Sequence, residues 1–140
     1  MTEGYITIKD VSCIGPSDVT DETIMECYYK YKNASSPIAV NYTEDIADGD
    51  RCKSALTISP EGFVTMHRSG PFGTDMIFEK GARHVCNYES PAGVINIGID
   101  TLALDYNFDK SGGKLELEYF IDCDADRFAK KKLEITVETR

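Results

Sequence analysis

The sequence predicts an all-β domain whose antiparallel strands form a closed barrel or two packed sheets. Three observations support this prediction. Short runs of alternating apolar and polar residues recur along the 140-residue chain. Clusters of Gly, Pro, Asn, Asp and Ser separate these runs, and no convincing long helical pattern interrupts them. About nine or ten strands at such regular spacing are typical of barrels and sandwiches.

The first part of the chain contains three clear strand patterns and one ambiguous segment. Alternation predicts strands at residues 5–11, 38–43 and 52–58, with turn chemistry at 15–18 and 48–50. Residues 20–31 fit either an amphipathic helix behind a Thr20 cap or a strand. The aromatic content of this segment favours the strand, along which Met25, Cys27, Tyr29 and Tyr31 alternate.

The segment from Phe63 to Tyr88 forms the centre of the predicted sheet. Gly-containing turns divide it into three antiparallel strands, and side chains alternate along each of them. One face of these strands carries Val64, Met66 and Arg68, then Thr74, Met76 and Phe78, then His84, Cys86 and Tyr88. Arg68 is therefore a charged residue on an otherwise mostly apolar face.

Alternation predicts three longer strands in the last part of the chain. One face of the first of these strands carries Ile95, Ile97, Ile99 and Thr101. Near Leu102 the apolar residues move to the other face, which predicts a β-bulge or a corner. After a hairpin loop at 109–113, the expected core residues of the returning strand are Leu115, Leu117, Tyr119 and Ile121. In the final strand they are Leu133, Ile135 and Val137.

Composition limits the classes of partner. The length predicts a single domain over residues 1–140, and 24 acidic against 15 basic residues give a net charge of -9. Such a field repels nucleic acids and anionic membrane surfaces. Five widely spaced cysteines without a Cys-x-x-Cys pair, and no segment typical of a signal peptide, predict free thiols in the cytoplasm.

The motifs that could carry catalysis or metal binding are incomplete. Residues 122–126 imitate the start of a calcium loop, but the required glycine position holds Arg127 and the closing acidic position holds Leu133. His67 and His84 point to opposite faces, and Ser69 lacks a nucleophile elbow. The basic cluster is expected to be a solvated strand entrance; it comprises Arg127, Lys130, Lys131 and Lys132. We therefore expect no enzyme, cofactor or metal site.

Several of these residues resemble a known family. Arg68-Ser69-Gly70, the pattern Met76-x-Phe78-x-x-Gly81, Tyr88 and the Ile-rich strand ending at Thr101 resemble the YwiB-like uncharacterised bacterial proteins. The resemblance extends loosely from Ile6 to Glu138. It implies a calycin-type barrel, an up-and-down antiparallel barrel of about 8–10 strands similar in shape to lipocalins. The resemblance implies no established activity. The loop near residues 15–21 and the stretch at 123–126 depart from the family pattern.

Two functional hypotheses follow from Arg68. An interior arginine can close one end of the barrel by pairing with a carboxylate or backbone carbonyls, or it can meet the anionic head of a small ligand. The candidate ligand-binding residues share the inward parity of neighbouring strands: Met66, Arg68, Met76, Phe78, Tyr88 and Thr101. The alternative function is an interaction module with a filled barrel, including a homodimer built on the aromatic strand near Tyr28, Tyr29 and Tyr31.

Overall fold

The computed structural model describes residues 1–14, 17–45, 51–70, 73–90, 93–123 and 126–140. The described residues form ten strands: β1 (Thr2–Ile14), β2 (Ser17–Lys30), β3 (Ile38–Asp45), β4 (Arg51–Ile58), β5 (Phe63–Arg68), β6 (Thr74–Glu79), β7 (Arg83–Ser90), β8 (Gly93–Asp109), β9 (Gly112–Cys123) and β10 (Asp126–Thr139). The expected turns at 15–16, 48–50, 71–72 and 91–92, and positions 124–125 of the calcium-like stretch, lie outside the described residues.

The strands form one closed antiparallel barrel, so the predicted fold class is confirmed. Each strand pairs with its neighbour in sequence, and β1 pairs with β10 to close the circle. Residues 20–30 of the ambiguous segment lie in β2, so the strand favoured over the helix is present, and its Cys27 and Tyr29 are buried. The described residues contain no helix long and apolar enough to cross a membrane.

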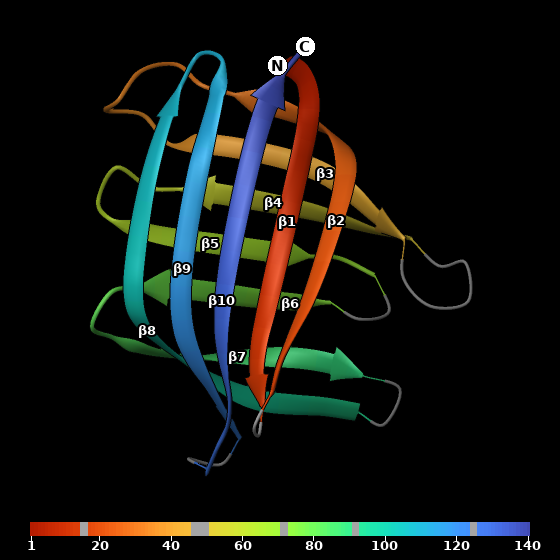
Figure 1. Cartoon of the computed structure of the whole chain (residues 1–140), viewed down its shortest axis with the longest axis vertical. Helices are drawn as coiled ribbons and strands as arrows, with labels where there is room; N and C mark the ends of the chain where they lie inside the picture. Colours follow the sequence, from red (N-terminus) through yellow and green to blue (C-terminus); the bar gives the residue numbers. More distant parts are fainter. Residues whose placement is uncertain (15–16, 46–50, 71–72, 91–92, 124–125) are drawn as a thin grey trace.

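The barrel is flattened into two layers (Figure 1). The strands β1, β2, β9, β10 and the second part of β8 run along one layer, and β3 to β7 cross behind them. β8 belongs to both layers, and its register with β9 shifts between Thr101 and Ala103. The predicted bulge is therefore present. Leu102 is exposed at the shift, while Thr101 is buried on one side of it.

Apolar side chains fill one part of the barrel completely. Phe78 packs edge-on against Tyr119, with 4.9 Å between the ring centroids. The expected core residues of β9 and β10 are buried here, with Ile121 at the margin. Tyr29 also points inward and donates a hydrogen bond to the carbonyl oxygen of Asp109 over 2.6 Å. Fully buried aliphatic side chains complete this region: Val40, Leu56, Ile58, Val64, Ile99 and Ile135.

A bidentate ion pair braces β7, β8 and β9. Arg83 donates from Nε to Oδ2 of Asp122 over 2.9 Å and from Nη2 to Oδ1 over 2.5 Å. The pair passes directly over Gly98, where an added Cβ would collide with both side chains. Gly98 therefore provides the space in which a buried carboxylate meets its arginine.

The seam between β2 and β3 is short. Within the described residues, β2 pairs with β3 only from Cys27 to Lys30, whereas it pairs with β1 from Ser17 to Tyr29. The first ten residues of β2 thus diverge from the end of β3. This divergence leaves an opening in the side of the barrel.

All five cysteines are free. Cys27, Cys52 and Cys86 are buried, while Cys13 and Cys123 are half-buried. Burial raises the pKa of the Cys27 and Cys86 thiols, so both remain protonated at neutral pH. Their contribution is to packing, as expected for buried thiols.

Candidate functional site: a polar cavity at the open end of the barrel

A cavity of about 320 Å³ lies inside the barrel, next to the filled region. It is formed where β3 and β5 end and where β6 begins, opposite the middle of β1 and β10. The volume is at the lower limit of typical ligand pockets. The sequence folds this way because several strands carry a polar residue at an inward position near one end.

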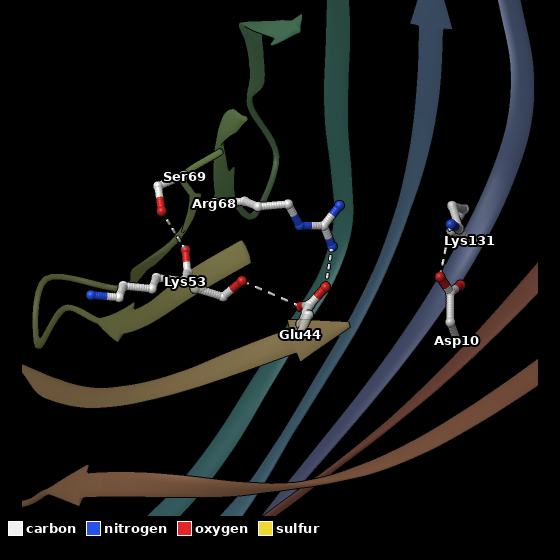
Figure 2. A network of polar contacts seen from close by, with 7 residues as sticks. Asp10, Glu44, Lys53, Arg68, Ser69 and Lys131 are labelled. Carbon is white, nitrogen blue, oxygen red and sulfur yellow. Dashed lines mark hydrogen bonds and ion pairs between the residues drawn. The ribbon is translucent and has the colours of Figure 1, made fainter. Parts of the chain in front are cut away.

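Two ion pairs face this cavity from different strands (Figure 2). Arg68 donates from Nη2 to Oε2 of Glu44 over 2.7 Å, and Lys131 donates from Nζ to Oδ2 of Asp10 over 2.9 Å. Arg68 and Glu44 come from β5 and β3, whereas Lys131 and Asp10 come from β10 and β1. The cavity therefore carries charges of both signs on opposing walls.

Each pair leaves binding capacity unused. The Arg68 side chain is 31% exposed, and within the described chain its single ion pair uses only Nη2. Oδ1 of Asp10 is buried and has no hydrogen-bond partner among the described residues. A guanidinium has five N–H donors and a carboxylate about four acceptor sites. Arg68 can therefore donate to a further partner, and Asp10 can accept from one once its carboxylate turns Oδ1 towards the cavity.

Hydroxyl groups extend the polar wall. Ser54 donates from Oγ to Oε1 of Glu44 over 3.4 Å, a long hydrogen bond. Burial raises the pKa of Tyr42 above its ordinary range, and the neighbouring Glu44 carboxylate raises it further. Burial also raises the pKa of Tyr119 above its ordinary range, and the charge of Asp10 raises it further. Both tyrosines are neutral at physiological pH and can donate or accept hydrogen bonds.

The remaining walls are apolar. Tyr119 closes the floor, because its ring packs on Phe78 in the filled region while also lining the cavity. The apolar lining residues come from both layers of the barrel: Ile8, Met66, Met76, Ile97, Ile121 and Leu133. Mostly apolar walls with a few fixed polar groups are the usual composition of a small-molecule site.

The structure brings four of the six sequence-predicted residues together. Met66, Arg68, Met76 and Tyr88 line the cavity. Phe78 lies below it in the filled region, where it is fully buried. Thr101 lies at the bulge of β8, also buried, and its Oγ1 has no hydrogen-bond partner among the described residues.

Sequence reasoning missed three of the four charged residues of the cavity. Lys131 belongs to the cluster expected to be solvated, and this expectation is wrong for Lys131, which shares the inward parity of Leu133. Asp10 likewise follows the inward Ile6 and Ile8, and Glu44 follows the inward Val40 and Tyr42. Parity could have identified all three, because each continues an inward series at the end of an apolar run.

The cavity opens through the seam between β2 and β3. A second hollow of about 330 Å³ shares Asp10, Glu44 and Arg68 with the first and extends to Asp21 and Thr23 on β2. A larger groove of about 730 Å³ runs across the outside of β2 to β5, past Ile24, Tyr28 and Lys53. We place the candidate site in the interior cavity, because partly buried charges from both of its walls converge there.

The histidines and Ser69 lie outside this arrangement of charges. His67 pairs through Nδ1 with Asp75 and is mostly exposed, and His84 pairs with Glu79 over 3.0 Å. Ser69 donates to the carbonyl oxygen of Lys53 over 3.1 Å. No group of three or more potential metal-ligating side chains occurs in the described part of the chain.

An up-and-down barrel with a cavity at one end, mostly apolar but lined by four charged residues, is the class of protein that these features define. Comparison with protein-family models matches residues 6–135 to "Domain of unknown function (DUF1934)", and the chain belongs to this family. The fold is similar to that in the crystal structure of the YwiB protein from Bacillus subtilis. The TM-score is 0.87 at 21% identity, and the match covers 99% of this chain and 92% of that one. The comparison with curated proteins gave no match.

Proposed function

We propose that the protein binds a small molecule in the interior cavity, with an apolar body against the methionine and isoleucine side chains and an acidic head at Arg68. The observation that supports this most directly is the partly exposed guanidinium of Arg68, which faces an apolar-walled cavity with donors to spare. An acid bound there would gain charge-assisted hydrogen bonds in a partly desolvated site. The lipocalin-like shape implied by the family resemblance is compatible with this role.

A barrel with a purely structural role would be expected to have a filled interior. An arginine with a purely structural role would donate all of its hydrogen bonds to its own chain, because leaving a buried donor unpaired costs free energy. Arg68 instead has one carboxylate partner, and space remains beside it. This geometry favours a binding role over that of a plug.

The four methionines allow a direct test. Met66 and Met76 line the cavity, whereas Met1 is exposed at the N-terminus. Titration of methyl-labelled protein with 3-phenylpropionate, an acid with a compact apolar body, should shift the Met66 and Met76 methyl resonances saturably and leave Met1 unchanged. Arg68→Met should weaken binding by about 1.5–3 kcal/mol, the contribution of a hydrogen bond to a charged group.

The matched control is Lys110→Met, which removes a cation from the exposed β8–β9 turn. It should leave the affinity unchanged. Unperturbed Met66 and Met76 resonances at millimolar ligand, or equal affinities for the Arg68→Met and Lys110→Met variants, would rule out this function.

A second candidate function, self-assembly, is supported by a different surface. On the outer face of β2, Ile24 is 64% exposed and Tyr28 is 53% exposed, and both border the outer groove. Tyr29 and Tyr31 do not belong to this surface, because Tyr29 is buried and the two rings stack. Light scattering after size-exclusion chromatography tests this candidate. A dimer that Tyr28→Ser converts to a monomer would support it, and a wild-type monomer at 100 micromolar would exclude it.

A further inference from the structure

We infer that the ligand is a zwitterion of the amino-acid type: an apolar body that carries an acidic group for Arg68 and an ammonium group for Asp10. This inference rests on the proposed function and specifies the chemistry of the same site. Three features of the cavity support it: its balance of charges, its unused acceptor and the position of its apolar wall.

The first feature is the charge balance. Among the described residues that line the cavity, the permanently charged side chains are two cations, Arg68 and Lys131, and two anions, Asp10 and Glu44. His67 is the remaining basic group at its edge, and it already pairs with Asp75. A singly charged ligand would add an uncompensated charge to this partly desolvated space, which is unfavourable. A zwitterion adds none.

The second feature is the unused acceptor. Asp10 accepts from Lys131 through Oδ2, while Oδ1 is buried without a partner in the described part of the chain. Leaving such an atom unsatisfied costs free energy, which a ligand donor would recover when the partly exposed carboxylate turns Oδ1 towards the cavity. An ammonium group supplies that donor with the complementary charge. The acidic group of the same ligand can use the remaining N–H donors of Arg68.

The third feature is the spatial arrangement. Figure 2 shows Arg68 with Glu44 on one side and Asp10 with Lys131 on the other, with the Arg68 guanidinium extending towards the side of Asp10 and Lys131. The apolar wall formed by Met66, Met76 and Ile97 belongs to the same cavity. A molecule whose two charged groups sit at one end of an apolar body would fit all three surfaces.

The test compares three probes with the same phenyl body. These are L-phenylalanine, 3-phenylpropionate without the ammonium group, and 2-phenylethylamine without the carboxylate. Binding is measured from the Met66 and Met76 methyl resonances, with a thermal melt of each variant to confirm folding. L-phenylalanine should bind at least tenfold more tightly than either analogue.

Variants assign the two charged contacts. Asp10→Asn should weaken binding of L-phenylalanine about tenfold or more without weakening that of 3-phenylpropionate, whereas Arg68→Met should weaken both. Asp105→Asn removes a carboxylate from an exposed position on β8 and is the matched control, with no expected effect on either ligand.

The outcomes separate this inference from the proposed function. If 3-phenylpropionate binds as tightly as L-phenylalanine, the zwitterion inference fails while the proposed function stands. An Asp10→Asn variant that binds L-phenylalanine normally also overturns the inference. If 2-phenylethylamine binds most tightly, or no probe shifts Met66 and Met76, both the inference and the proposed function fail.

Discussion

The outer face of the barrel and its open end each contain an arginine–carboxylate pair, but the two pairs differ in geometry. Arg83 holds Asp122 with two hydrogen bonds over the bare backbone of Gly98. Arg68 holds Glu44 with one hydrogen bond beside a cavity. A bidentate contact fixes both side chains, whereas a single contact leaves one partner able to turn. The same fold thus holds one ion pair whose contacts fix both side chains and another that leaves donors unused beside a cavity.

The largest effect should come from placing a charge in the filled region. Leu117 is buried in the core, whereas its neighbour Glu118 faces outward and pairs with Lys130 over 2.7 Å. Leu117→Asp should lose several kcal/mol, comparable to the whole stability of a domain, because the new carboxylate has no partner there. Glu118→Gln should lose less than about 1 kcal/mol. Equal urea midpoints for the two variants would show that the inward parity of β9 is wrong.

A smaller loss is expected when the bidentate pair is displaced. Gly98→Ala places a Cβ where the Arg83 guanidinium and the Asp122 carboxylate meet, so Arg83 must swing away from the sheet. The melting temperature should fall by several degrees. Arg83→Gln, which removes the same pair without adding a Cβ, should give a fall of similar size. A Gly98→Ala protein as stable as the wild type would mean that the pair does not brace the barrel.

Alkaline pH should reveal the buried hydroxyl of the filled region. Burial raises the pKa of Tyr29 from 10.0 to about 12, with the charge of Asp109 and the neighbouring Tyr31 adding to it. The folded state thus favours the neutral hydroxyl. This contribution is complete below pH 10 and is lost as the pH rises from about 10 to about 12. Tyr29→Phe should therefore show a shallower fall in urea midpoint across that window. Parallel profiles for the two proteins would contradict the assignment.

The smallest effect on stability is expected at the open end. Replacing both partners in the variant Glu44→Gln/Arg68→Met should leave the free energy of unfolding within about 1 kcal/mol of the wild type, because removing both charges also removes their desolvation cost. Glu44→Gln alone should be less stable than the double variant if the pair is coupled. Chemical denaturation measures both, and a large loss in the double variant would give this pair the same structural role as Arg83–Asp122.

Local periodicity was sufficient to predict most of the strands and the inward faces of several of them. Alternation placed Leu115 and Leu117 in the core and located the bulge beside Leu102. It also placed Arg68 on the inside, because parity is a local property of a strand. The sequence therefore predicted the fold class and one residue at the centre of the candidate site.

The ion pairs could not be predicted in the same way. Asp10 and Lys131 are 121 positions apart, and their contact requires β1 to pair with β10 in one register. Inward parity alone does not show whether Phe78 lies below the cavity or beside it. Closure and register depend on all strands together, so partners and depth become visible only in the assembled barrel.

The pairing of the first strand with the last has a consequence for the folding order. β1 pairs with β10 from Gly4 opposite Thr139 to Cys13 opposite Lys130, so contacts of very long sequence separation close the barrel. Such contacts form slowly, because a long loop must be closed before they are gained. On the ribosome, β1 can pair with β2 early, but its other edge must wait until β10 has been synthesised. One wall of the cavity, with Asp10 and Lys131, is therefore completed only in the final step of folding.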